Sequence, residues 1–303
     1  MKILAPAKVN LALDILGQEK RSGFHYLQTI YLKIPLYDEI ELQESDEWKF
    51  EFFTQKKFLR EDIKEINPLS NIFHKVLQHY QGQKKYFVKV NKNIPVGTGL
   101  GGASSNAAAL LKFLQISNKY QHREFKKNEN SFIENYKLKI KNCRAADKSL
   151  TVGADVNVFM TEGQLFLGEY FGEKLTKLDF DFSSVAKKVF IYLPRKLRSQ
   201  TQNAFSFINL EKCAKNKNKT ERILELIKNN SLRREDLPHL LHNDFLQIKE
   251  LSEVSEKLQN RAFLTGSGSA FFAFEDIGCS DDFIKIECEL SYYMENTSPE
   301  EKL

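Results

Sequence analysis

The stretch NIPVGTGLGGASSNAAALL, residues 93–111, is the part of the sequence best suited to hold a charged ligand. Four glycines fall within six positions, at Gly97, Gly99, Gly101 and Gly102, and glycine lets a backbone approach a ligand without an intervening Cβ. Alanines and leucines follow, and these are strong helix formers. The free N–H groups and the dipole of a helix N-terminus would then point at the same space. The stretch therefore predicts a phosphate-binding loop, since a plain turn needs only one or two glycines.

The class of this loop is not one of the two common ones. The string Gly97-x-Gly99-x-x-Gly102 matches the dinucleotide fingerprint, but a Rossmann loop is followed about 20 positions later by an acidic residue. Positions 117–122 contain no acidic residue. A P-loop requires Lys and then Ser or Thr after its last glycine, and here Ala103 stands in that place.

Four further side chains are candidates for chemistry: Lys8, Asn10, His25 and Asp155. Asp155 is the one carboxylate in a largely apolar run, where a carboxylate usually caps a helix, pairs with a cation or takes part in a reaction. Lys8 and Asn10 share one face of a strand predicted over Ile3–Leu16, because apolar and polar residues alternate there. Taken alone, a solvated strand face also explains that pair, and a surface position explains His25.

The elements that must position these residues alternate in type along the chain. Strands are predicted at Ile3–Leu16, Leu27–Ile34, Ile40–Leu42, Trp48–Phe53, Tyr86–Val90, within 163–172 and at Lys188–Pro194. Helices are predicted after Asn71, after the glycine-rich loop, over Thr220–Ile227 and from His239 to about Gln259. A second, smaller glycine loop at residues 265–269 lies between a short strand and an apolar strand, and a simple connecting turn also explains it.

Composition narrows the class of protein. A chain of 303 residues is long enough for one large or two ordinary domains. It has no run of 18 apolar residues and no leader-like start, so we expect no membrane span and no transit peptide. Its cysteines are scattered, which favours a reducing cytoplasm over zinc or disulfide sites: Cys143, Cys213, Cys279 and Cys288. The net charge of +5 suits anionic small molecules but does not indicate a nucleic-acid partner.

Several ordered stretches resemble the GHMP kinases, the superfamily of galactokinase, homoserine kinase, mevalonate kinase and phosphomevalonate kinase. They are PAKVNLALDILG with SGFHYLQTIYLKIPLYDEI, then IPVGTGLGGASSNAAALL, VGADVNVF and LTGSGSAFFAF. The opening at 6–11, with 23–25 and 153–156, is similar to the branch whose acceptor is a cytidine-diphosphate-linked methylerythritol. The resemblance spans nearly the whole chain, apart from residues 118–148 and 206–236.

The resemblance implies an α+β fold of two domains. Residues 1–162 would form the ATP-binding domain, with a βαβ crossover of unusual left hand, and residues 163–303 a ferredoxin-like domain. The acceptor site would lie in the cleft between them. The implied reaction transfers the γ-phosphoryl group of ATP, with Mg²⁺, to the 2-hydroxyl group of the acceptor, in a monomer or homodimer. A mevalonate- or homoserine-type kinase, or a non-catalytic nucleotide-binding homologue, is the alternative.

The resemblance also implies roles for single residues. Asp155 would accept the hydroxyl proton, and Lys8 beside it would keep Asp155 ionised and neutralise the transferring phosphoryl group. The ATP site would consist of Pro95, Gly97, Gly99, Leu100, Gly101, Gly102, Ala103, Ser104 and Ser105, with Asn71 near the adenine. The acceptor site would consist of Asn10, Phe24, His25, Thr201 and Phe205.

Within the acceptor site, Asn10 would contact phosphate and His25 would read the cytosine edge, while Phe24 and Phe205 stack on its ring. The family more often has Tyr at Phe24, and stacking survives that change. No dedicated acidic ligand for Mg²⁺ is evident, so contact would come mainly through phosphates and water, with Ser104 a possible ligand. Two other departures, at Ala103 and Asn157, remove no catalytic atom.

Overall fold

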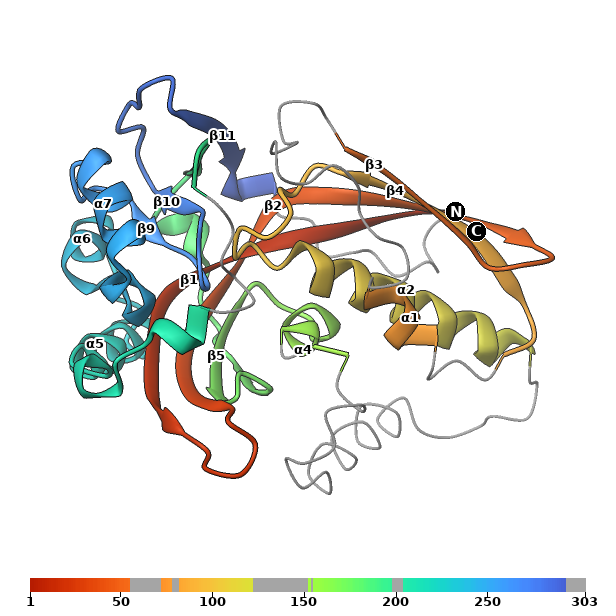
Figure 1. The fold of residues 1–303 in the computed structure, drawn as a ribbon, viewed down its shortest axis with the longest axis horizontal. Helices are drawn as coiled ribbons and strands as arrows, with labels where there is room; N and C mark the ends of the chain where they lie inside the picture. Colours follow the sequence, from red (N-terminus) through yellow and green to blue (C-terminus); the bar gives the residue numbers. More distant parts are fainter. Residues whose placement is uncertain (55–71, 78–81, 122–151, 154, 198–203, 293–303) are drawn as a thin grey trace.

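The strands form two sheets in this computed structural model, which describes residues 1–54, 72–77, 82–121, 152–153, 155–197 and 204–292 (Figure 1). The first sheet has the order β3-β4-β2-β1-β8, and β5 pairs with both β2 and β6. Its strands are β1 (Lys2–Gln18), β2 (His25–Ser45), β3 (Lys49–Thr54), β4 (Lys85–Lys92), β5 (Leu165–Tyr170), β6 (Lys174–Lys177) and β8 (His242–Asn243).

Strands β1 and β2 form a long antiparallel hairpin that runs across the molecule (Figure 1). The predicted strand at Ile3–Leu16 is confirmed as β1, and the two predicted strands at Leu27–Ile34 and Ile40–Leu42 are parts of the single strand β2. Lys8 pairs directly with Lys33, and Asn10 with Tyr31. The hairpin therefore presents these four side chains together.

The second sheet is antiparallel, with the order β11-β7-β10-β9. Its strands are β7 (Lys188–Pro194), β9 (Phe263–Leu264), β10 (Phe271–Ala273) and β11 (Phe283–Glu289). The predicted strand at Lys188–Pro194 is confirmed. Strands β5 and β6, and later in the chain β8, belong to the first sheet, and the domain boundary after residue 162 stays a prediction.

Helices lie at both ends of the long hairpin. Helices α1 (Ile72–Leu77), α2 (Gly102–Gln121) and α4 (Val156–Met160) lie on one side of the first sheet, and α5 (Lys217–Lys228), α6 (Leu237–Leu240) and α7 (Lys249–Lys257) gather at the opposite end (Figure 1). Short 3₁₀ segments occupy Phe182–Ser184, Ala204–Phe207, Leu210–Lys212, Arg234–Asp236, Asp244–Gln247 and Leu290–Tyr292. None of the helices in these ranges combines the length and apolar character needed to cross a membrane.

The prediction of one helix from His239 to about Gln259 is wrong. Residues His242–Asn243 instead pair with β1, and the buried carboxylate of Asp244 accepts a hydrogen bond from the backbone N–H of Ile15 at 2.8 Å. The helical pattern of the sequence is thus overridden by tertiary contacts. Only the part from Lys249 to Lys257 remains as α7.

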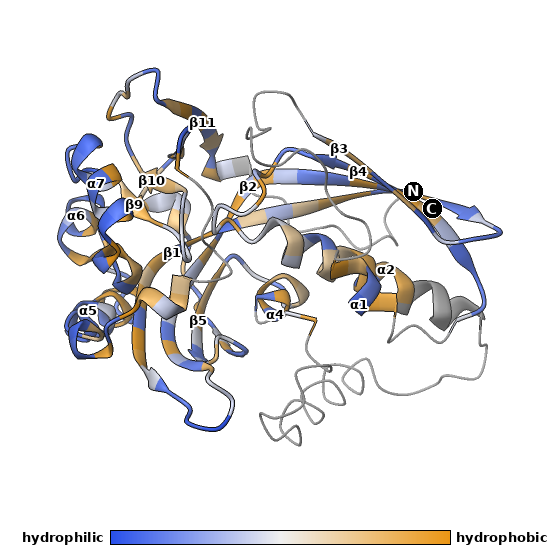
Figure 2. Ribbon diagram, viewed as in Figure 1, coloured by the Kyte–Doolittle hydropathy of each residue, from blue (hydrophilic) through white to orange (hydrophobic). Residues whose placement is uncertain are grey.

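The core consists of three packed clusters. One lies between the first sheet and α1, α2 and α4, one joins the two sheets, and one fills the end of β1 against β7, β10 and α7. Figure 2 shows hydrophilic residues on the outer side of α5, α6 and α7 and apolar residues where they meet the strands. Two glycine-rich loops lie in the seam between the sheets, next to the polar face of the hairpin.

The start of the first glycine loop is fixed by the buried carboxylate of Asp38 on β2. This carboxylate accepts hydrogen bonds from the backbone N–H groups of Asn93 and Ile94 at 2.7 and 2.8 Å, and from the ammonium group of Lys92. Ile94 and Lys92 also lie against Gly102, where the loop passes into α2. The carboxylate of Asp38 thus fixes the start of the loop, and the residues that it fixes pack against the first residue of α2.

Substituting Asp38→Ala is expected to lower the free energy of unfolding by about 3–5 kcal/mol, because the buried Lys92 ammonium group loses its partner. Urea denaturation measures the effect. The matched control is Glu44→Ala, whose pair with Lys84 is solvent-exposed and should contribute at most about 1 kcal/mol. Equal effects of the two substitutions would contradict the role given to Asp38.

Candidate functional site

The first glycine loop has the backbone geometry of an anion-binding nest. Positive φ angles of 68°, 82° and 77° occur at Gly97, Gly99 and Gly101, at every second residue. Alternation between left-handed and ordinary conformations turns successive backbone N–H groups toward one side. These positive angles also explain why glycine stands at these positions.

The carbonyl groups of the loop are bonded to the protein behind it. The carbonyl of Thr98 accepts from the N–H of Ala270, and the carbonyl of Leu100 accepts from the N–H of Lys8, each at 3.0 Å. In a planar trans peptide the N–H that follows a carbonyl points the opposite way. The N–H groups of Gly99 and Gly101 therefore point away from Ala270 and Lys8.

The second glycine loop packs directly on the first. A Cβ at Gly99 would lie 2.2 Å from the carbonyl oxygen of Thr265, and a Cβ at Gly266 would lie 2.9 Å from the carbonyl oxygen of Gly99. Asn243 holds the second loop in place by donating to the carbonyls of Leu264 and Gly266 at 3.0 and 2.8 Å. The second loop is thus a backbone support for the first, rather than a simple turn.

Lys8 and Asp155 come together beside the first glycine loop. The Nζ atom of Lys8 lies 3.6 Å from Oδ2 of Asp155 and donates to Oδ1 of Asn10 at 2.6 Å. Lys8 is only 2% exposed, and this burial lowers the pKa of its ammonium group, while Asp155 acts in the opposite direction. A buried cation and a carboxylate at the mouth of an anion-binding loop are suited to phosphoryl transfer.

Tyr31 is a site residue that the sequence did not reveal. Its hydroxyl group donates to Oδ1 of Asp155 at 3.1 Å, and the Nζ atom of Lys8 lies 5.6 Å from its ring centroid. Burial, reinforced by the negative charge of Asp155, raises the pKa of Tyr31 well above its usual value. The phenol therefore stays a hydrogen-bond donor to the carboxylate. Alternation along β2 indicated its face, but only the strand register places it opposite Asn10.

The side chain of Asn10 is fully engaged within the protein. Its Oδ1 accepts from Lys8 and from the N–H of Gly266 at 2.9 Å, and its Nδ2 donates to the hydroxyl of Thr29 at 2.8 Å. The hydroxyl oxygen of Thr265 accepts a hydrogen bond from the backbone N–H of Asn10 at 3.2 Å. Asn10 thus connects Lys8 to the second glycine loop, and its predicted contact with phosphate stays a prediction.

Two of the predicted acceptor residues, Phe24 and His25, lie at the turn end of the β1–β2 hairpin, and Phe205 reaches them from the 3₁₀ segment Ala204–Phe207. The rings of His25 and Phe205 stack with centroids 4.6 Å apart, whereas Phe24 packs against Phe171 at 5.6 Å. The structure thus brings His25 and Phe205 together and places Phe24 in a neighbouring aromatic contact. Burial lowers the pKa of His25, which favours the neutral ring with one donor and one acceptor. Thr201 lies outside the described residues.

Most of the remaining predicted ATP residues surround the first turn of α2. Leu100 is buried, the carbonyl of Pro95 accepts from the hydroxyl of Thr98, and Ala103 is exposed. The Oγ atom of Ser105 and Oδ1 of Asn106 are buried and make no hydrogen bond within the described structure. Ser104 lies on the side of α2 that faces Gly153. Asn71 lies outside the described residues.

No group of three or more His, Cys, Asp or Glu side chains in the described part of the chain is arranged to hold a metal ion. Mg²⁺ in phosphoryl-transfer sites is usually bound by one or two protein oxygens together with water and substrate phosphates. The unpaired hydroxyl of Ser105 is the kind of oxygen ligand that fits Mg²⁺ in such an arrangement.

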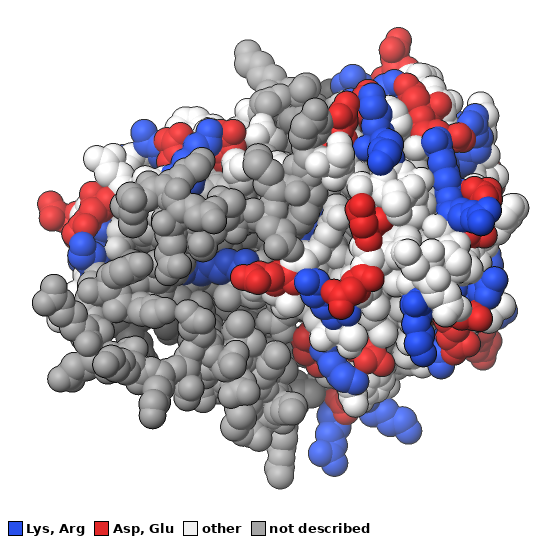
Figure 3. Space-filling model, turned by 180° about the vertical axis from the view of Figure 1, so that it is seen from behind, with Lys and Arg blue, Asp and Glu red and all other residues white. Residues whose placement is uncertain are grey.

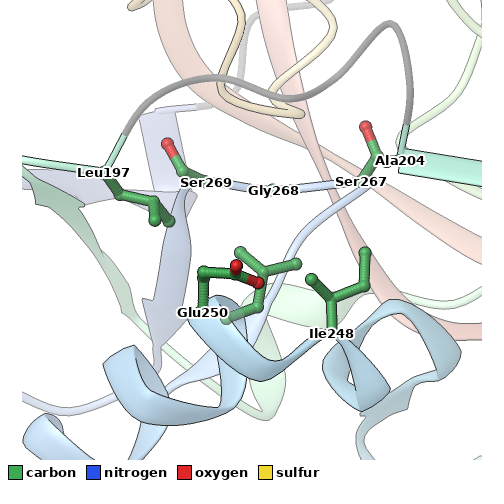
Figure 4. A pocket seen from close by; sticks show the side chains of 8 residues that line it. Leu197, Ala204, Ile248, Glu250, Ser267, Gly268 and Ser269 are labelled. Atoms are coloured by element: carbon green, nitrogen blue, oxygen red, sulfur yellow. The ribbon is translucent and has the colours of Figure 1, made fainter. Parts of the chain in front are cut away.

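A pocket opens where the second glycine loop faces α7 (Figure 4). It is lined by Leu197, Ala204, Ile248, Glu250, Leu251, Ser267, Gly268 and Ser269, and none of these is a predicted site residue.

The face shown in Figure 3 carries interspersed basic and acidic side chains over its described part. That part has no single-sign patch of the kind that binds a phosphodiester backbone.

The comparisons with known proteins agree with this geometry. Residues 67–158 match the family described as "GHMP kinases N terminal domain". The chain is 30% identical over 283 residues to 4-diphosphocytidyl-2-C-methyl-D-erythritol kinase of Sulfurihydrogenibium sp. (strain YO3AOP1), covering 90% of each protein. It is 28% identical to the protein of the same name from Persephonella marina (strain DSM 14350 / EX-H1), covering 90% of this chain and 91% of that relative.

Solved structures share the fold. A crystal structure of 4-(cytidine 5'-diphospho)-2C-methyl-D-erythritol kinase superposes with a TM-score of 0.61 at 22% identity, covering 91% of this chain and 90% of that one. A crystal structure of mevalonate kinase gives a TM-score of 0.58 at 16% identity, covering 96% and 99%. The predicted α+β fold is confirmed, while the left-handed crossover stays a prediction.

Substituting Gly99→Ala is expected to destabilise the protein by about 1–3 kcal/mol and to weaken ATP binding, because the added Cβ clashes with the second loop. Urea denaturation and an ATP titration measure the two effects. Gly278→Ala is the matched control, since Gly278 also has a positive φ angle but open space around its Cβ position. If both variants lost the same stability, strain in the backbone alone would explain the result.

Proposed function

The chain belongs to the 4-diphosphocytidyl-2-C-methyl-D-erythritol kinase family of GHMP kinases, and from this premise we propose its reaction. The enzyme transfers the γ-phosphoryl group of ATP to the 2-hydroxyl group of 4-diphosphocytidyl-2-C-methyl-D-erythritol, a step of non-mevalonate isoprenoid biosynthesis. The observation that carries the proposal is the Lys8–Asp155 pair, 3.6 Å apart, beside an anion-binding nest.

In this reaction Asp155 acts as the general base. Its Oδ1 is occupied by the Tyr31 hydroxyl group, so the carboxylate is held with Oδ2 toward Lys8. The acceptor hydroxyl gives its proton to this carboxylate while the hydroxyl oxygen attacks the γ-phosphorus of ATP, and ADP leaves. The buried ammonium group of Lys8 compensates the negative charge that gathers on the transferring phosphoryl group.

The donor phosphates bind the outward N–H groups of the first glycine loop and the N-terminus of α2. Magnesium, bound with ATP, would neutralise phosphate charge, and the hydroxyl groups of Ser104 and Ser105 are the protein oxygens available to it. The cytoplasmic location and the monomer or homodimer stay predictions.

The acceptor's cytosine ring is proposed to bind at the hairpin end that carries His25. The neutral imidazole can exchange hydrogen bonds with the base edge, and the exposed face of Phe205 offers a stacking surface. The present stacking of His25 on Phe205 supports a shared aromatic site. Phe24 contributes from its contact with Phe171 at the rim.

Likeness of fold does not choose the acceptor, because structures of mevalonate kinase and homoserine kinase superpose almost as well, with TM-scores of 0.58 and 0.57. A coupled ADP-release assay with the cytidine-linked methylerythritol, mevalonate and homoserine separates the possibilities. Preference for either of the last two would overturn the proposed acceptor. Binding of ATP and acceptor without ADP release would instead favour the non-catalytic alternative.

Substituting Phe205→Ala is expected to weaken CDP binding about 10-fold or more, through loss of one base-stacking surface. Calorimetric titration with CDP measures this affinity, and ATP affinity should stay unchanged. Phe207→Ala is the control, because Phe207 is an exposed aromatic residue in the same 3₁₀ segment. Equal losses in the two variants would place the base elsewhere.

Substituting Asp155→Asn is expected to lower kcat by about 10²- to 10⁴-fold, because the amide cannot accept the hydroxyl proton. ATP affinity should hardly change, since the nest is built from backbone groups. Steady-state kinetics and an ATP titration test both points. Asp179→Asn, at an exposed carboxylate, should retain full activity. A kcat of Asp155→Asn close to that of the wild-type protein would disprove the assignment of the base.

A further inference from the structure

Helix α4 carries the proposed base at its N-terminal end but has little means of holding itself in place. It has five residues, Val156–Met160, and helices this short are not stable without tertiary contacts. Asp155 stands at its N-cap position, yet its carboxylate makes no capping hydrogen bond to the helix. The orientation of the carboxylate must therefore be set by residues outside α4.

Two residues of β2 contact the two ends of this helix. At the N-terminal end, the Tyr31 hydroxyl donates to Oδ1 of Asp155 at 3.1 Å. At the C-terminal end, the buried ammonium group of Lys33 donates to the carbonyl oxygen of Thr161, the C-cap residue, at 2.6 Å. Tyr31 and Lys33 are two residues apart on one strand, so they project from the same face.

Lys33 is well suited to hold a helix end. A cation near the last carbonyl groups complements the negative end of the helix dipole. Its Nζ also lies 4.8 Å from the ring centroid of Phe166. The backbone of Lys33 exchanges two further hydrogen bonds with Gln164, at 2.9 and 3.2 Å, so the turn that follows α4 is fixed to β2 as well.

The position of Lys33 also brings two buried positive charges opposite each other. It pairs directly with Lys8 across the hairpin, and like charges at such a position disfavour the pairing. Both lysines are buried, with exposures of 3% and 2%. Each therefore needs its own acceptors: Lys8 uses Asn10 and Asp155, and Lys33 uses Thr161.

The ring of Tyr31 is closely packed against two glycines. A Cβ at Gly168 would lie 2.5 Å from Cε2 of Tyr31, and a Cβ at Gly172 would lie 2.7 Å from its hydroxyl oxygen. Gly168 lies within β5, and Gly172 lies in the turn between β5 and β6. The ring of Tyr31 is thus confined at two points, and its hydroxyl is a fixed reference for the carboxylate.

We propose that Tyr31 and Lys33 form a two-point clamp that holds α4 and thereby orients the carboxylate of Asp155. Tyr31 contacts the base itself, while Lys33 is a positioning residue that acts through α4. The proposal deepens the proposed function and rests on it, because it assigns the clamp a role in that same reaction. A displacement of the base by about 1 Å is enough to slow such a reaction about 100-fold.

Kinetics of Lys33→Met test the clamp. We expect kcat to fall about 10- to 100-fold, with the KM for ATP and for the acceptor changing less than about threefold. Lys33→Arg, which keeps the cation, should recover most of the activity. Tyr31→Phe keeps the ring and removes one hydrogen bond, so it should also lower kcat. This variant replaces Lys33→Met as the test of the clamp if Lys33→Met folds poorly. Lys174→Met is the control, because Lys174 has an ion pair and an aromatic contact at an exposed position.

A double variant separates positioning from general damage. If Lys33 acts only through Asp155, adding Lys33→Met to Asp155→Asn should lower kcat no further. A loss of the same factor in both backgrounds, or unchanged kcat in Lys33→Met alone, would overturn the clamp.

Hydrogen–deuterium exchange gives a readout that does not depend on the acceptor. In Lys33→Met, amide protection should fall in a peptide that covers residues 155–161, and it should not fall in Lys174→Met. Unchanged protection would count against the clamp even in an active enzyme. If the wild-type protein phosphorylated none of the three acceptors, the proposed function would fail, while the exchange result would still decide whether β2 holds α4.

Discussion

The buried ammonium group of Lys8 is the constraint on which the site depends. A cation that is nearly excluded from water requires partners in fixed places, and each partner comes from a different part of the fold. Asn10 belongs to the same strand, and Asp155 stands at the start of α4. The backbone N–H of Lys8 holds the carbonyl of Leu100 in the first glycine loop. Correct placement of one side chain therefore requires the hairpin, the loop and the helix together.

Contact between the two glycine loops explains why the second sheet is needed for chemistry on the first. At closest approach the loops meet backbone to backbone, and a single Cβ at Gly99 or Gly266 would separate them. Asn243, from the segment that returns to pair with β1, fixes the second loop from behind. The phosphate-binding nest is thus held by groups distant in sequence, and its shape does not depend on the local turn alone.

The features that are encoded locally could be predicted from the sequence. Glycine spacing predicted a phosphate loop, alternation along β1 put Lys8 and Asn10 on one face, and short ordered blocks indicated the family. The role of Tyr31 could not be predicted, because it depends on the register between β1 and β2 and on the position of α4. The helix predicted within residues 239–259 was wrong, because part of this segment pairs with β1 and Asp244 makes buried contacts.

The proposed sites for donor and acceptor are built from different kinds of atoms, and this difference explains why likeness of fold does not identify the acceptor. In the proposed function the ATP phosphates meet backbone N–H groups, whose arrangement depends on the glycines and not on the identity of most side chains. The proposed acceptor meets side chains such as His25 and Phe205 at the far end of the hairpin. Kinases with unlike acceptors can therefore share the fold at 16% identity or less. In the proposed function, specificity is carried by a few side chains around a common backbone site. The acceptor is therefore supported by the relatives that match over nearly the whole sequence and not by the shared fold.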